Sequence, residues 1–167
     1  MDLPRLESRF KSLQRVLHPD RWATRGASDR SRSAALAARL NVAYACLRDP
    51  LPRARYLLQL AAAGDAAPAS AAHSGGREEE EEAVVVACPE LLSEVLEMRE
   101  AVEEAGVGPE AAWRLRQLQG ANAASRGACL GAMGDAFREG RREAAKAEVS
   151  RLAYLDKLDE EIRSRLP

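Results

Sequence analysis

Aromatic and β-branched side chains are scarce in this chain, and their scarcity argues against a β-sheet protein. Aromatic residues make up only 4% of the sequence, and valine, isoleucine and threonine, which favour strands, are also few. Alanine, leucine, arginine and glutamate are abundant instead, and all four are strong helix formers. The composition therefore predicts an all-α protein.

The chain also lacks the patterns of membrane, metal-binding and secreted proteins. No apolar run approaches the roughly 18 residues that cross a bilayer, and the start, MDLPRLESRF, has no apolar signal core. Cys46, Cys88 and Cys129 are widely spaced, without a C-x-x-C pattern. We therefore expect no metal site, no cofactor and no disulfide framework, but small thiols in a reducing compartment.

The net charge of −1 conceals an uneven distribution of charge along the chain. Residues 1–62 carry 12 Lys and Arg against 5 Asp and Glu, a net charge of +7. Residues 77–105 carry 2 arginines against 11 glutamates, a net charge of −9. The basic first part predicts an acidic partner, and nucleic acid fits that prediction as well as a protein does.

Hydrophobic periodicity predicts two amphipathic helices in the first part of the chain. The first runs from Leu3 to Leu17, with apolar residues at steps of three and four, and Asp2 can cap it. The second is expected over residues 31–47, after a polar loop over residues 23–30. Two such helices joined by a polar loop form an antiparallel hairpin.

The chain divides into three parts by composition. Residues 1–63 end with a short helix over residues 53–63. Residues 64–88 are rich in alanine, glycine and serine and then run into five consecutive glutamates, which is typical of a flexible acidic linker. Residues 89–167 return to helical periodicity in three segments separated by glycines, and these are expected to pack as a three-helix antiparallel bundle.

A tripeptide, His18-Pro19-Asp20, interrupts the periodicity between the first two helices. Pro19 disfavours the α region at His18, so the chain has to turn there. A turn that contains proline and aspartate is ordinary, but this one follows a basic helix and joins two amphipathic helices. The arrangement, in RFKSLQRVLHPDRW, resembles that of the J-domain family.

The resemblance to J-domains implies a partner and a mechanism. In that family the tripeptide touches a DnaK-type chaperone and triggers its ATP hydrolysis, while the basic helix docks on an acidic surface of the same chaperone. The positions that match are His18, Pro19, Asp20, Arg5, Arg9, Lys11, Arg15 and Arg21. We expect Asp20 to pair with a partner arginine and the basic side chains to steer association in a salt-dependent way.

A narrower resemblance covers nearly the whole chain apart from the acidic insert. ELLSEVLEMREAVEEA, followed much later by RLAYLDKLDEEI, resembles the C-terminal half of HscB, a family of J-type co-chaperones of iron–sulfur cluster assembly. LRDPLPRARYLLQL resembles the segment that joins the two halves of that family. In the family the bundle binds the scaffold protein on which clusters are built. Matching positions give Leu92, Leu96, Glu97, Arg99, Glu100, Glu104 and Tyr154 as the scaffold-binding residues.

The residues themselves leave two interpretations of this segment open. Leu92 and Leu96 lie about 100° away from the core-facing Leu91 and Val95 on a helical wheel. They could belong to a broad core face, or they could form a small apolar patch rimmed by charge, which is typical of a protein-binding site.

The chain departs from the HscB family most clearly at its start. That family has another helix, rich in aromatics, before the basic helix, so we expect the first helix of the J-domain to be missing. The stripe that includes Leu6, Phe10 and Leu13 would then lose packing partners, each worth about 1.5–3 kcal/mol when buried. The J-domain is therefore expected to be marginally stable, with weak amide protection over residues 5–17.

These features predict an adaptor without an active site of its own. It would stimulate ATP hydrolysis by a DnaK-type chaperone and deliver the iron–sulfur scaffold protein to it. The alternatives are a J-domain co-chaperone with other clients, a nucleic-acid-binding helical protein, and an enzyme that uses His18 and Asp20 as acid–base groups. The acidic insert favours a eukaryotic source and hence the mitochondrial matrix, with a bacterial or eukaryotic cytoplasm as the alternative.

Overall fold

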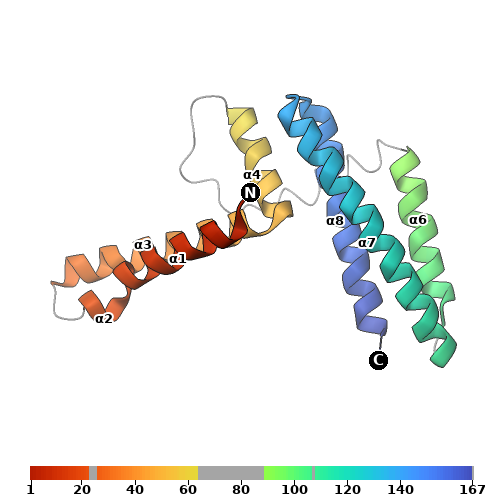
Figure 1. Cartoon of the computed structure of the whole chain (residues 1–167), viewed down its shortest axis with the longest axis horizontal. Helices are drawn as coiled ribbons and strands as arrows, with labels where there is room; N and C mark the ends of the chain where they lie inside the picture. Colours follow the sequence, from red (N-terminus) through yellow and green to blue (C-terminus); the bar gives the residue numbers. More distant parts are fainter. Residues whose placement is uncertain (23–25, 64–88, 107, 167) are drawn as a thin grey trace. The chain divides into compact units, whose positions relative to one another are not determined.

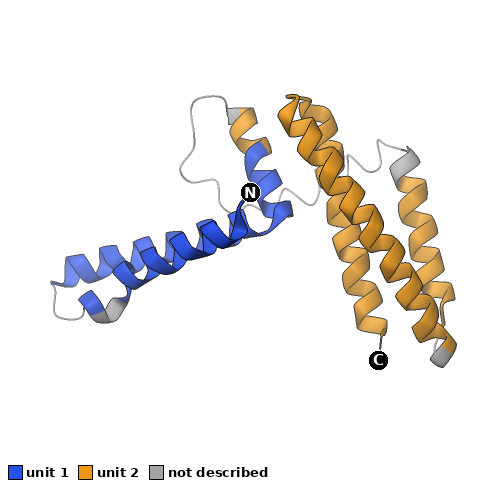
Figure 2. Ribbon diagram, in the orientation of Figure 1, with its two compact units in different colours: residues 1–57 blue, residues 58–167 orange. Residues whose placement is uncertain are grey.

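The computed structural model describes residues 1–22, 26–63, 89–106 and 108–166, and every regular element in these ranges is a helix (Figure 1). The expected all-α fold is confirmed. Two compact units are present, Met1–Leu57 and Leu58–Pro167 (Figure 2), and the division falls inside α4 (Pro50–Ala63). The expected linker over residues 64–88, with Cys88, lies outside the described residues, so the domain boundaries at 63 and 89 stay a prediction.

The first unit is built on a pair of helices that lie side by side, α1 (Leu3–Leu17) and α3 (Ala27–Arg48) (Figure 1). The carboxylate of Asp2 caps α1 as expected, because it accepts a hydrogen bond from the amide of Arg5 at 3.0 Å. The rings of Phe10 and Tyr44 stack between the two helices, with centroids 4.0 Å apart.

The apolar stripe of α1 is only partly covered by α3. No residue of α1 is buried. Leu6, Phe10 and Leu17 are half-buried, while Leu3 and Leu13 are 47% and 36% exposed. The weak amide protection expected over residues 5–17 stays a prediction, and the low burial of α1 agrees with it.

Two of the expected helix boundaries in this unit are wrong. The predicted loop over residues 23–30 is shorter, because α3 begins at Ala27 and includes Asp29 in its first turn, where a carboxylate interacts favourably with the helix dipole. The helix expected from Arg53 begins at Pro50, because the Asp49 carboxylate accepts from the amide of Leu51 at 3.0 Å and caps its first turn. Polar composition alone does not separate a loop from an exposed first turn of a helix.

The second unit contains the expected three-helix bundle, made of α6 (Pro89–Glu104), α7 (Pro109–Arg138) and α8 (Arg142–Arg165) (Figure 1). One buried cluster joins all three helices through Val102 of α6 and Ala105 just after it, Leu115 of α7, and Leu158 and Ile162 of α8.

Polar groups set the alignment of α7 against α8. Asn122 is 1% exposed, and its amide group donates to the carbonyl of Leu155 at 2.9 Å. Arg126 pairs with Asp156, with 2.6 Å between Nε and Oδ1. A shifted register would leave the Asn122 amide buried without this partner, at a cost of about 1–3 kcal/mol.

The glycines inside α7 offer a route to a more stable bundle. Gly131 is exposed, and a Cβ added there would meet no atom within 4 Å. Because glycine in a helix interior costs about 1 kcal/mol relative to alanine, Gly131→Ala should raise the free energy of unfolding by about 0.5–1 kcal/mol. Thermal and urea unfolding, followed by circular dichroism, measure this change.

The matched control for that change is Gly140, between α7 and α8. Its φ is +69°, a conformation that an alanine adopts only with strain. Gly140→Ala should therefore destabilise the bundle under the same conditions. A Gly131→Ala protein no more stable than the parent would contradict the prediction.

Candidate functional site

The His18-Pro19-Asp20 tripeptide lies directly after the C-terminus of α1. His18 is exposed and has φ −58° and ψ 130°, so the chain leaves the helical conformation there, as the following proline predicts. The backbone becomes helical again at once, in the short helix α2 (Pro19–Trp22). The expected turn is therefore present, but two of the three residues belong to a helix rather than to an open loop. The side chains of Pro19 and Asp20 lie outside the described part of the structure.

Three successive carbonyl groups at the end of α1 find donors from outside that helix. The last carbonyls of a helix have no intrahelical partner. The Val16 carbonyl accepts from the indole N–H of Trp22 at 3.0 Å, and the Leu17 carbonyl accepts from the hydroxyl of Ser33 at 3.0 Å. The His18 carbonyl accepts from the amide N–H of Arg21 at 3.1 Å. These hydrogen bonds connect the tripeptide to both α1 and α3, and they fix its position within the first unit.

Sequence reasoning missed Trp22 and Ser33 as positioning residues. Trp22 lies two residues after the tripeptide and is one of only two tryptophans in the sequence, which could have singled it out. Ser33 is 3% exposed but sits in a polar stretch, SDRSRS, where nothing in the sequence distinguishes it from its neighbours. Its role depends on the approach of α3 to the end of α1.

Replacement of Ser33 should loosen the end of α1. Ser33→Ala leaves the Leu17 carbonyl without its described donor, and we expect a loss of about 1–3 kcal/mol in the stability of the first unit. Amide hydrogen exchange over α1 measures this unit separately from the bundle. Ser31→Ala is the matched control, because Ser31 is exposed on the same helix. Equal exchange rates in the two variants would show that the hydroxyl does not hold the junction.

The basic residues expected to bind a chaperone are all exposed. They are Arg5, Arg9, Lys11, Arg15 and Arg21. Lys11 differs from the others, because its ammonium group pairs with the carboxylate of Glu7 one turn earlier, at 2.7 Å. The hydrogen bond between them lowers the pKa of Glu7 and raises the pKa of Lys11, so both stay charged at neutral pH. Within the described residues the positive field of α1 therefore comes chiefly from its arginines.

The outer face of α6 presents the residues expected to bind the scaffold protein. Leu92, Leu96, Glu100 and Glu104 recur every four residues and so lie along one side of the helix. Leu96 is 57% exposed and Leu92 is half-buried. The interpretation of a broad core face therefore fails for Leu96. A role in binding stays a prediction for both leucines, and for the exposed Glu97 and the other charged residues of this face.

Two arginines of α8 tie that helix to α6. Arg151 pairs with Glu94 of α6 at 2.6 Å, and this hydrogen bond raises the pKa of Arg151. Arg165 donates to the carbonyl of Val102 at 2.8 Å. Tyr154 is half-buried on the same helix, and the ammonium group of Lys157 lies 5.8 Å from the centre of its ring. Its expected role in scaffold binding stays a prediction.

The buried thiol of Cys129 has no reactive setting. Cys129 is buried, and its thiol donates to the Glu148 carbonyl at 3.2 Å. Burial, and after it the nearby Glu148 carboxylate, raises the pKa of Cys129 to about 12, so it stays a neutral thiol. Among the described residues, no three His, Cys, Asp or Glu side chains are grouped to hold a metal ion. None of the described helices is long and apolar enough to cross a bilayer.

Comparison with known proteins identifies the family. Residues 87–163 match the family described as the HSCB C-terminal oligomerisation domain. A co-chaperone protein HscB homolog from Azoarcus sp. (strain BH72) is 35% identical over 172 residues, which cover 99% of this chain and 86% of that protein. The structure of chaperone HscB from Vibrio cholerae is 27% identical, with a TM-score of 0.79 over 98% of this chain and 88% of that one. Human co-chaperone HscB, at 23% identity and a TM-score of 0.77 over 98% of this chain and 74% of its own, shares the fold. The chain therefore belongs to the HscB family of co-chaperones.

Proposed function

We propose that this chain is a J-type co-chaperone of iron–sulfur cluster assembly. Its first unit would stimulate ATP hydrolysis by a DnaK-type chaperone, and its bundle would bind the scaffold protein on which clusters are built. The observation that carries the proposal is that two exposed surfaces of opposite charge lie on separate units. One is the arginine-rich α1 with His18 at its end, and the other is the α6 face around Leu96.

The first surface suits an acidic partner that is recognised at one end of a helix. The arginines of α1 would attract an acidic chaperone surface over a distance of about 10 Å at 0.1 M salt. The bonds from Trp22 and Ser33 to the end of α1 hold the tripeptide in one place. A preorganised contact loses less conformational entropy on binding. The ATP and its chemistry belong to the chaperone, and this chain contributes contacts only.

The second surface is suited to a partner that presents an apolar side chain surrounded by basic residues. Leu96 supplies an exposed apolar side chain, and Glu97, Glu100 and Glu104 surround it with negative charge. Small apolar centres with polar rims are typical of protein interfaces. Because the two surfaces lie on different units, the scaffold and the chaperone would not compete for the same residues.

A single-turnover ATPase assay tests the proposal. The parent chain should accelerate ATP hydrolysis by the DnaK-type chaperone, and the scaffold protein should increase the acceleration further. Acceleration should decline between about 50 and 200 mM salt, because exposed charges are screened over this range. Acceleration without any effect of the scaffold would favour a J-domain co-chaperone with other clients. An unchanged ATPase rate would refute the co-chaperone function.

The source organisms of the related proteins bear on the cellular compartment of this chain. Azoarcus, and Burkholderia thailandensis with a relative that is 28% identical, are bacteria, and they give no support to the expected mitochondrial matrix. We therefore propose the alternative, a reducing cytoplasm, which also suits the buried neutral thiol of Cys129.

A further inference from the structure

Of the three helices of the bundle, α6 is the one that is packed least. It makes far less contact with α7 and with α8 than those two helices make with each other (Figure 1). Among the described side chains of α6, only Val102, in its last turn, is buried. Segments with few buried contacts open locally at a low cost in free energy. The N-terminal half of α6, which carries Leu92 and Leu96, therefore depends on other interactions to stay in place.

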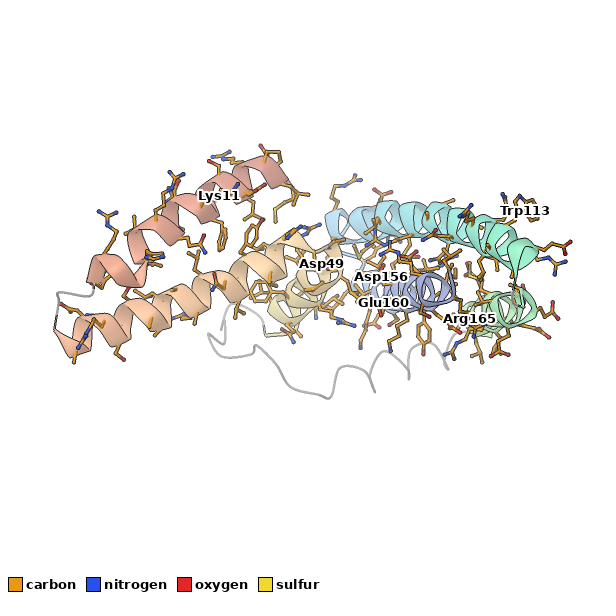
Figure 3. The ribbon with its side chains drawn as sticks, turned by 90° about the horizontal axis from the view of Figure 1, so that it is seen from below. Lys11, Asp49, Trp113, Asp156, Glu160 and Arg165 are labelled. Atoms are coloured by element: carbon orange, nitrogen blue, oxygen red, sulfur yellow. The ribbon has the colours of Figure 1, made fainter. Side chains whose placement is uncertain are left out.

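One ion pair joins that half of α6 to α8. The carboxylate of Glu94 accepts a hydrogen bond from Nη2 of Arg151 at 2.6 Å. The second arginine contact, from Arg165 in the last turn of α8 (Figure 3), reaches the carbonyl of Val102 at the end of α6 that is already buried. Among the described residues, the pair of Glu94 and Arg151 is thus the one side-chain hydrogen bond that ties the leucine-bearing half of α6 to another helix.

The guanidinium group of Arg151 is directed to α6 rather than to its own helix. Its Nε is buried and has no hydrogen-bond partner among the described residues, and the same is true of Oε2 of Glu148, one turn earlier on α8. Buried polar atoms without a partner are unfavourable. Arg151 nevertheless bonds across the helix interface to Glu94, and a charge-assisted hydrogen bond of this kind is stronger than one between neutral groups. The pair therefore fixes the N-terminal half of α6 against α8.

This ion pair lies on the side of α6 opposite to the two leucines. Glu94 is two residues away from both Leu92 and Leu96, which is about 160° around the helix axis. Because Glu94 faces α8, a partner that covers the leucines does not touch Arg151 through that face. Arg151 can affect binding there only through the position of α6.

We propose that Arg151 is the positioning residue of the scaffold-binding face. Paired with Glu94, it holds the N-terminal half of α6 where Leu92 and Leu96 meet the iron–sulfur scaffold protein as one surface. This inference rests on the proposed function, and it adds to that function the residue that determines how much of the protein presents the face. Loss of the pair lowers the fraction of molecules with α6 in place, and the apparent Kd rises as that fraction falls.

Isothermal titration of the full chain with cluster-free scaffold protein tests the inference. Arg151→Gln should weaken binding about fivefold or more, and amide hydrogen exchange over residues 92–99 should become faster by a similar factor in the absence of the scaffold. Arg151→Lys keeps the positive charge opposite Glu94, so it should recover part of the lost affinity. Binding by Arg151→Gln that is as tight as that of the parent would refute the positioning role.

Arg126→Gln is the matched control for a general loss of stability. Arg126 pairs with Asp156 at the same distance of 2.6 Å, and the two side chains are 35% and 30% exposed, against 36% for Arg151 and 33% for Glu94. This pair joins α7 to α8, so its loss should lower the thermal stability of the bundle but leave the affinity for the scaffold unchanged. Equal losses of affinity in the two variants would overturn the inference, because they would reflect bundle stability alone.

A double-mutant cycle tests whether Arg151 acts through Glu94. Glu94→Ala should weaken binding of the scaffold to about the same extent as Arg151→Gln. The combined variant should bind no more weakly than either single variant, because both changes remove the same ion pair. Losses that add would contradict the inference, since Arg151 would then act independently of Glu94.

The failure of this inference is distinguishable from failure of the proposed function. If Arg151→Gln binds the scaffold as the parent does while replacement of Leu92 and Leu96 abolishes binding, Arg151 is not a positioning residue but the scaffold function stands. If the parent itself does not bind the scaffold, both proposals fail.

Discussion

A His18→Gln protein should lose most of its ability to accelerate ATP hydrolysis by the DnaK-type chaperone. We expect the stimulated rate to fall at least about tenfold, towards the rate of the chaperone alone. Loss of one hydrogen-bonding partner at a desolvated contact costs about 2–5 kcal/mol, which corresponds to a factor of about 30 or more. Single-turnover hydrolysis, with the chaperone preloaded with ATP, measures this rate without a contribution from nucleotide exchange.

The backbone at position 18 accommodates this substitution. His18 is exposed, and its φ of −58° and ψ of 130° are open to glutamine. The hydrogen bond from the Arg21 amide uses the backbone carbonyl of His18, which the substitution retains. Thermal unfolding equal to that of the parent would show that a loss of stimulation reports on the contact with the chaperone rather than on folding.

Gln14→Ala is the matched control for His18→Gln. Gln14 is exposed on α1, uncharged, and outside the set of residues expected to bind the chaperone. It should stimulate the chaperone as the parent does. The co-chaperone interpretation of the tripeptide would be wrong if the parent is active and His18→Gln matches it in this assay.

The combined change of Leu92→Ala and Leu96→Ala should weaken binding of the scaffold protein about 100-fold. Burial of one leucine is worth about 1.5–3 kcal/mol. Leu96 is 57% exposed in the free chain and Leu92 is half-buried, so a partner can cover only part of each. A combined loss of about 3 kcal/mol follows, which corresponds to about two orders of magnitude in Kd. Isothermal titration with cluster-free scaffold protein measures it.

The same double variant should stimulate the chaperone normally when the scaffold is absent. Alanine favours the helix, so α6 is retained, and the ion pair between Glu94 and Arg151 still ties α6 to α8. Leu36→Ala is the matched control, because Leu36 is 45% exposed on α3, outside the patch. Unchanged scaffold affinity in the double variant would remove the α6 face from the proposed site.

Periodicity predicted the bundle well because burial there follows the helical repeat. Leu115, Leu152 and Ile162 lie in the segments where helical periodicity predicted the bundle, and all three are at most 1% exposed. Each lies on a long helix with one continuous apolar side, so spacing along the chain is sufficient to choose the buried face. The predicted cap at Asp2 was also correct, since it depends on residues only three positions apart.

Prediction was weaker where polar residues begin a helix or bridge two helices. The stretch that contains Asp29 was expected as a loop but forms the first turn of α3. Ser33 was not singled out, although it is buried and donates to the Leu17 carbonyl, 16 positions away in the chain. A hydrogen bond across two helices depends on how they approach each other, and a single sequence contains no direct signal of that approach.

The sequence by itself determined the helical fold, the position of the tripeptide after a basic helix, and the residues that resemble the HscB family. These features are local, since helix propensity, apolar spacing and a proline turn act within a few residues. Only the tertiary structure decided that Leu96 lies outside the core, that Lys11 is paired with Glu7, and that the Ser33 hydroxyl donates to the Leu17 carbonyl. Exposure and pairing depend on which side chains of other turns and helices come within contact distance, and folding alone brings them there.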